Sequence, residues 1–89
     1  MTEILIIEDE GLAAGRLKKM LEETDSRIKV VGILERVSSA VQWFREHPQP
    51  DLLMLDIQLA DGLSFEIFKQ VRVDSFVIFT TAYDEYAIK

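Results

Sequence analysis

The chain has 89 residues, of which 48% are hydrophobic, a formal net charge of −6 and no cysteine. This length fits one domain and this apolar content argues against disorder. The acidic balance disfavours direct binding to nucleic acid or anionic membranes, because both require clustered Lys and Arg. The single histidine argues against a His-based zinc site. No apolar stretch approaches the roughly 20 residues that span a bilayer, so the expected location is the cytoplasm.

The first half of the chain predicts two strands and two helices. A short apolar run at residues 4–7 indicates a buried strand, and apolar positions three and four residues apart predict an amphipathic helix over residues 11–24. Residues 28–34 form the second predicted strand. We expect Ser38 or Ser39 to cap the next helix, which runs to Glu46 with its apolar residues facing inward.

The second half repeats this alternation. The apolar run at residues 52–55 predicts the third strand. Ser64 is expected to cap a helix from residue 65 to about residue 72, and residues 76–80 form the fourth predicted strand. Asp84 and Glu85 are typical of the start of another helix. The turn residues Asp61 and Gly62 lie between the third strand and its helix.

Alternating strands and helices with short connections indicate an α/β fold with a doubly wound parallel sheet. In the flavodoxin-like arrangement the strand order is 2-1-3-4-5, which places the ends of strands one and three side by side. We therefore expect Glu8, Asp9 and Asp56 to converge at one edge of the sheet, with Thr81 close by.

Three carboxylates in one cleft repel each other, and a hard divalent cation such as magnesium or manganese relieves that repulsion. Beside such an ion, Asp56 could act as a nucleophile on phosphorus and form an aspartyl phosphate. The Thr81 hydroxyl could then donate a hydrogen bond to a phosphoryl oxygen. Taken singly, each acid is more often a solvated loop residue than a functional one, and it is their joint placement at strand ends on one edge that favours function. Asp61 with Gly62 is better explained as a turn than as a ligand.

Four segments are informative together, namely residues 4–10, 51–56, 61–62 and 79–89. They resemble the receiver domain of bacterial two-component response regulators, specifically the LytR/AlgR type, with its CheY-like fold. The resemblance implies that Asp56 accepts a phosphoryl group from a sensor histidine kinase and that Thr81 is the switch hydroxyl. It also implies that Asp9, Glu8, Asp56 and the main-chain carbonyl of Gln58 bind Mg²⁺.

The resemblance implies a signalling module that catalyses only its own phosphorylation and dephosphorylation to control an effector output. Nucleic acid would be bound only through an effector domain absent from these 89 residues. Residues 1–89 are expected to be a receiver domain truncated at its C-terminus, without the fifth strand, the last helix and the Lys on that strand, since Lys89 comes too early. An exposed fourth strand then predicts weak stability, a homodimer or other self-association.

Two other functions stay open. A Mg²⁺-dependent phosphohydrolase would use Asp56 as a transient nucleophile, but Gln58 stands where such enzymes often place a second acid and cannot protonate a leaving group. A receiver-like fragment could instead act only as a protein-interaction module. Treatment with acetyl phosphate distinguishes these readings, since a stable adduct, rapid turnover and the lack of an adduct each favour one of them.

Overall fold

The computed structural model describes residues 1–80, so Thr81 and the helix expected from Asp84 lie outside the described residues. Within this part, strands and helices alternate along the chain as predicted, with one additional short hairpin. The elements are β1 (Thr2–Ile7), α1 (Gly11–Thr24), β2 (Ile28–Leu34), α2 (Val37–Glu46), β3 (Leu52–Leu55), β4 (Gln58–Leu59), β5 (Gly62–Leu63), α3 (Phe65–Gln70) and β6 (Phe76–Phe79).

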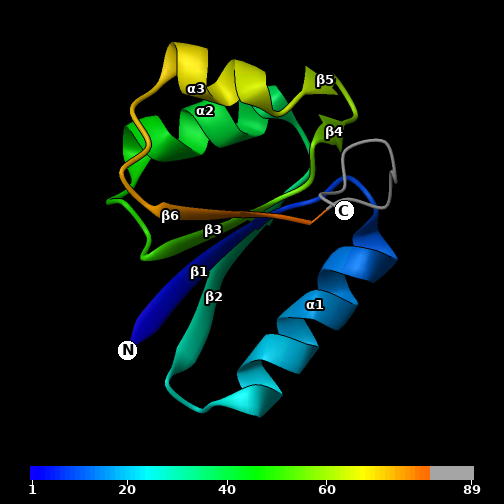
Figure 1. Cartoon of the computed structure of the whole chain (residues 1–89), viewed down its shortest axis with the longest axis vertical. Helices are drawn as coiled ribbons and strands as arrows, with labels where there is room; N and C mark the ends of the chain where they lie inside the picture. Colours follow the sequence, from blue (N-terminus) through cyan, green and yellow to red (C-terminus); the bar gives the residue numbers. More distant parts are fainter. Residues whose placement is uncertain (81–89) are drawn as a thin grey trace, which may run out of the picture.

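The main sheet has four parallel strands in the order β2-β1-β3-β6. This confirms the predicted 2-1-3-4 order. Helix α1 covers one face of the sheet, and α2 and α3 cover the other (Figure 1). The last residues of β1 and β3, Ile7 and Leu55, lie opposite each other in the ladder. The segments that follow these two strands therefore leave the sheet side by side.

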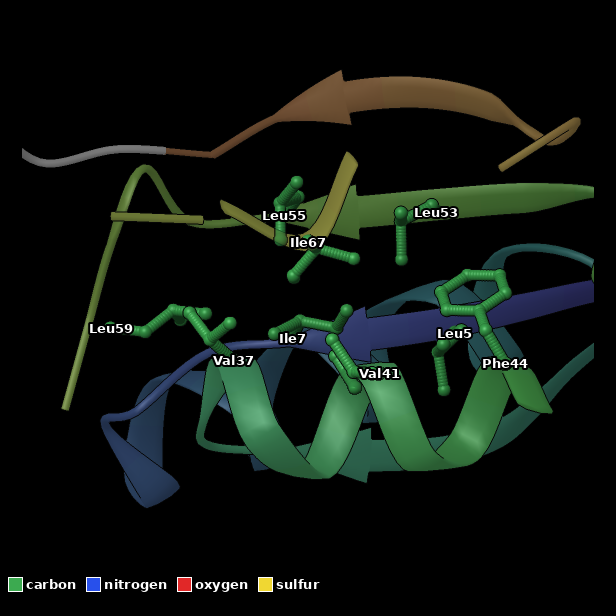
Figure 2. Close-up of a cluster of buried hydrophobic side chains, with 10 residues drawn as sticks. Leu5, Ile7, Val37, Val41, Phe44, Leu53, Leu55, Leu59 and Ile67 are labelled. Atoms are coloured by element: carbon green, nitrogen blue, oxygen red, sulfur yellow. The ribbon is translucent and has the colours of Figure 1, made fainter. Parts of the chain in front are cut away.

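Both faces of the central strands are buried, which explains why these strands are continuous apolar runs rather than alternating ones. Along β1, Leu5 and Ile7 point to the face under α2, and Ile4 and Ile6 point to the face under α1. Figure 2 shows the larger cluster, in which side chains from α2 and α3 pack onto β1 and β3. Its buried members are Leu5, Ile7, Val37, Ala40, Val41, Phe44, Leu53, Leu55, Leu59 and Ile67.

The expected helix caps are wrong in their details. Helix α2 begins at Val37, so Ser38 and Ser39 lie inside its first turn and do not cap it. Ser64 does precede α3, but its side chain makes no capping hydrogen bond, and the helix ends at Gln70 rather than near residue 72. The Ser64 hydroxyl is buried without a hydrogen-bond partner among residues 1–80.

A short antiparallel hairpin, β4–β5, follows the end of β3 and was not predicted as strands. The turn expected at Asp61 and Gly62 is confirmed, since Ala60 and Asp61 form the loop between the paired residues Leu59 and Gly62. Gly62 has φ +141°, a backbone conformation that side-chain-bearing residues rarely adopt. The hairpin lies at the same end of the sheet as the start of α1 (Figure 1).

Strand β6 is the outermost strand of the sheet in the described part of the chain. Phe76, Ile78 and Phe79 on this strand are 83%, 48% and 43% exposed, as the sequence led us to expect for residues 76–80. The self-association inferred from that exposure stays a prediction. No helix within residues 1–80 is both long and apolar enough to cross a membrane.

Candidate functional site

The acidic residues at the ends of β1 and β3 form one cluster. Glu8, Asp9 and Asp56 each place a carboxylate oxygen within 4.8 Å of those of the other two. The predicted strand order implied this convergence. Asp56 is buried, with 8% of its surface exposed, whereas Glu8 is half-buried and Asp9 is exposed. The cluster is therefore closed on the Asp56 side and open to solvent on the Asp9 side.

Backbone hydrogen bonds of the sheet hold two of these residues in place. The Asp56 N–H donates to the Ile7 carbonyl at 2.9 Å, and the Glu8 N–H donates to the Leu34 carbonyl at 2.8 Å. Each of these two acids thus extends a strand ladder by one residue, and the sheet fixes the position of its backbone. Asp9 follows as the next residue and leads into α1, whose first turn begins at Gly11.

The cluster is electrostatically strained without a cation. Burial, a hydrogen bond shared with Asp56 and the negative charge of Asp56 raise the pKa of Glu8 from 4.5 to about 7. The Oδ1 atom of Asp56 is buried and has no hydrogen-bond partner among the described residues.

This donor set fits a hard divalent cation. All available ligand atoms are carboxylate or carbonyl oxygens, which Mg²⁺ prefers, and the open side leaves room for the waters that it usually keeps. A cation would also give the buried Asp56 oxygen a partner, which a buried polar atom requires.

The acidic cluster lies in a cleft of about 770 Å³. Gln58 and Thr80 line this cleft, and α1 contributes a side that includes the basic residue Arg16. Sequence reasoning did not identify Arg16 as part of the cleft. The predicted switch residue Thr81 follows Thr80 directly but lies outside the described residues.

Gln58 occupies a distinctive position in the β4–β5 hairpin. Ile57 accepts a hydrogen bond from the Ser64 N–H at 2.8 Å, and Gln58 lies opposite Leu63. Neighbouring pairs in an antiparallel ladder alternate between bonded and non-bonded. The Gln58–Leu63 pair is therefore the non-bonded one, and the ladder leaves the Gln58 carbonyl free for another partner.

Comparisons with known proteins agree with this architecture. Residues 4–89 match the family model described as response regulator receiver domain. The sensory transduction protein LytT of Bacillus anthracis is 36% identical over 92 residues, and the transcriptional regulatory protein BtsR of Escherichia coli is 38% identical over 93 residues. Each match covers 100% of this chain and 37% of the relative.

A solved structure supports the same assignment. The receiver domain of the PhyR response regulator from Erythrobacter litoralis superposes with a TM-score of 0.73 at 35% identity, over 94% of this chain and 65% of that one. The chain spans little more than a third of the length of the curated relatives named above, and the match to LytT lies in its receiver domain. The family match over nearly the whole length, the strand order and the acidic cluster agree, and the chain belongs to the response regulator receiver domain family.

Proposed function

We propose that this receiver domain accepts a phosphoryl group on Asp56 in a reaction that depends on Mg²⁺ held by Glu8, Asp9, Asp56 and the main-chain carbonyl of Gln58. The observation that carries the proposal is the buried Oδ1 of Asp56, which has no hydrogen-bond partner among residues 1–80 and lies beside two further carboxylates. A buried carboxylate oxygen with no hydrogen-bond donor is expensive unless something else binds it.

The chain's own groups divide the chemistry among them. An oxygen of Asp56 attacks the phosphorus of the donor, the bond from phosphorus to the donor breaks, and the leaving group keeps that electron pair. The Asp56 N–H bonds to the Ile7 carbonyl and the preceding Leu55 carbonyl accepts from the Thr80 N–H, so little orientational freedom is lost in the transition state. When bound, Mg²⁺ would neutralise charge on the phosphoryl oxygens and orient them. We propose that the Thr81 hydroxyl contacts the phosphoryl group, on the basis of the position of Thr81 in the sequence.

The proposed physiological donor is a phosphohistidine of a sensor kinase, and the proposed output is control of an effector. The kinase donor and the effector output are properties proposed for the whole protein, not for the receiver domain alone. Their support is the family and the names of relatives that are described as transcriptional regulatory or sensory transduction proteins. On this proposal the chain is a signalling module whose chemistry is limited to its own phosphorylation and dephosphorylation.

The test is intact-mass analysis after incubation with acetyl phosphate, with Mg²⁺ and with EDTA. We expect one phosphoryl adduct that requires Mg²⁺ and disappears in Asp56→Asn. Asp74→Asn is the matched control, because Asp74 is an exposed acid paired with Arg72. It should be phosphorylated as the wild type is.

The alternative outcomes are informative. An adduct that persists in Asp56→Asn would refute the assignment of the acceptor. A wild-type chain with no Mg²⁺-dependent adduct would support an interaction module instead. Continuous release of phosphate with no accumulating adduct would indicate a phosphohydrolase.

A further inference from the structure

Asp61 joins two parts of the chain that are distant in sequence. Its Oδ1 accepts a hydrogen bond from the Val37 N–H at 2.7 Å, and its Oδ2 accepts one from the Ser38 N–H at 3.1 Å. These are the first two N–H groups of α2, which have no partner within the helix. Asp61 thus caps α2 from the loop of the β4–β5 hairpin.

The carboxylate is well suited to this contact. Burial raises the pKa of Asp61, but the hydrogen bonds from the Val37 and Ser38 N–H groups outweigh it and leave the pKa below its usual value. Asp61 is therefore charged at neutral pH, and charge strengthens both hydrogen bonds and the interaction with the positive end of the helix dipole.

The hairpin has little stability of its own. Each of its strands has two residues, and an isolated two-stranded hairpin is marginal even when longer. The favoured two-residue hairpin loops need at least one residue with positive φ, whereas Ala60 and Asp61 both have negative φ. Contacts from outside the hairpin must therefore determine where it lies.

Besides the packing of the buried Leu59 in the core, two hydrogen-bonded contacts anchor the hairpin. At its base, the Ser64 N–H bonds to the Ile57 carbonyl, one residue after the buried Asp56. At its loop, Asp61 bonds to α2. Gln58, whose carbonyl is free of the hairpin ladder, lies between these two anchors and lines the acidic cleft. Without the loop anchor, only the base of the hairpin and the packing of the buried Leu59 would hold Gln58.

We propose that Asp61 is a positioning residue for the cation site, which fixes the β4–β5 hairpin on the N-terminus of α2 so that the Gln58 carbonyl faces the carboxylates. This inference rests on the proposed Mg²⁺ site and extends it to a residue that does not touch the cation. In sequence, Asp61 looked like an ordinary turn residue.

The test is calorimetric titration of the whole 89-residue chain with Mg²⁺, at a temperature at which circular dichroism shows every variant folded. Supporting hydrogen bonds around metal sites typically contribute about tenfold or more to affinity. We expect Asp61→Ala to weaken Mg²⁺ binding by about tenfold and Asp61→Asn, which keeps one acceptor oxygen, to weaken it less.

Asp51→Ala is the matched control. The Asp51 carboxylate also accepts a backbone hydrogen bond, from the Glu3 N–H at 2.7 Å, but Asp51 lies just before β3, at the opposite end of the strand from Asp56. We expect its Mg²⁺ affinity to stay that of the wild type even if its stability falls. This separates a positioning effect from general destabilisation.

A second readout does not depend on the metal. Amide hydrogen exchange without Mg²⁺ should become faster in Asp61→Ala at Val37, at Ser38 and in the β4–β5 hairpin, but not in the hairpin of Asp51→Ala. Equal Mg²⁺ affinity in the Asp61→Ala and Asp51→Ala variants, or an unchanged hairpin exchange rate, would overturn the inference. A wild-type chain that binds no Mg²⁺ would overturn the proposed site itself, and with it the role of Asp61 there.

Discussion

Replacing Asp56 with Asn should stabilise the metal-free protein, although it removes the proposed acceptor. Asp56 is 8% exposed, and its carboxylate lies within 4.8 Å of two others. Asn has nearly the same shape and no charge, and its NH₂ group can donate to a neighbouring carboxylate. The substitution therefore removes repulsion without leaving a cavity.

The magnitude follows from Coulomb's law. Two carboxylates 4.8 Å apart repel each other by about 1 kcal/mol in bulk water and by about 3.5 kcal/mol at the effective dielectric constant of a protein surface. Because Asp56 is buried and Asp9 is exposed, we expect a net stabilisation of about 1 to 3 kcal/mol. The effect should be largest well above pH 7, where Glu8 is ionised, and smaller well below it.

The assay is urea unfolding in EDTA, followed by circular dichroism and by the fluorescence of Trp43. This indole is half-buried and stacks on the ring of His47 at 4.4 Å, so its environment should change on unfolding. As a control, Asp74→Asn should change stability by less than about 1 kcal/mol, because exposed ion pairs contribute little.

A mutant that is less stable than the wild type well above pH 7 would refute the crowded-carboxylate explanation. Addition of Mg²⁺ gives an independent check. It should stabilise the wild type by mass action and affect Asp56→Asn much less, so that the difference between the two shrinks or reverses. A difference that does not respond to Mg²⁺ would mean that Asp56 does not share a cation with its neighbours.

Two further predictions concern pH and the hairpin. Burial and the interaction with Asp56 raise the pKa of Glu8 from 4.5 to about 7. Between these two pH values the folded chain holds a proton that the unfolded chain has released. The stability of the metal-free protein should therefore fall as the pH rises from 4.5 to about 7. Urea melts of Glu8→Gln should lack this decline, and a wild-type curve that rises more steeply than that of the mutant would contradict the reasoning. Gly62→Ala should destabilise the chain by about 1 to 3 kcal/mol through backbone strain alone, since open space surrounds the position of a Cβ atom there. The control Gly15→Ala, inside α1 and equally open, should stabilise it by about 0.4 to 1 kcal/mol, and equal thermal shifts in both variants would refute the role of φ at Gly62.

The elements that sequence reasoning located well are those whose signal is local. Helix α1 spans Gly11–Thr24 as predicted, because its apolar positions recur at helical spacing. Strands β2 and β3 also have their predicted bounds, because they are short hydrophobic runs between polar or turn residues.

Two of the errors concern the start of α2 and the β4–β5 hairpin. The start of α2 could not be read from Ser38 and Ser39, because the group that caps the helix is the Asp61 carboxylate, 24 residues beyond Val37. The β4–β5 hairpin was missed because strands of two residues are too short to show any periodicity. Both errors concern the same hairpin, which tertiary contacts hold in place.

The sequence by itself determined the order of strands and helices, and it placed an acid directly after each of two central strands. The pattern of polar and apolar residues along each segment is a local property, so it can be recognised from the sequence without coordinates. Only the tertiary structure decided that Glu8, Asp9 and Asp56 come within 4.8 Å of one another and that Asp61 anchors the neighbouring hairpin. It also decided that one oxygen of Asp56 is buried with no hydrogen-bond partner in the described part of the chain. Those facts depend on how the packed sheet brings distant segments together, because burial and Coulomb interactions act through space and not along the chain.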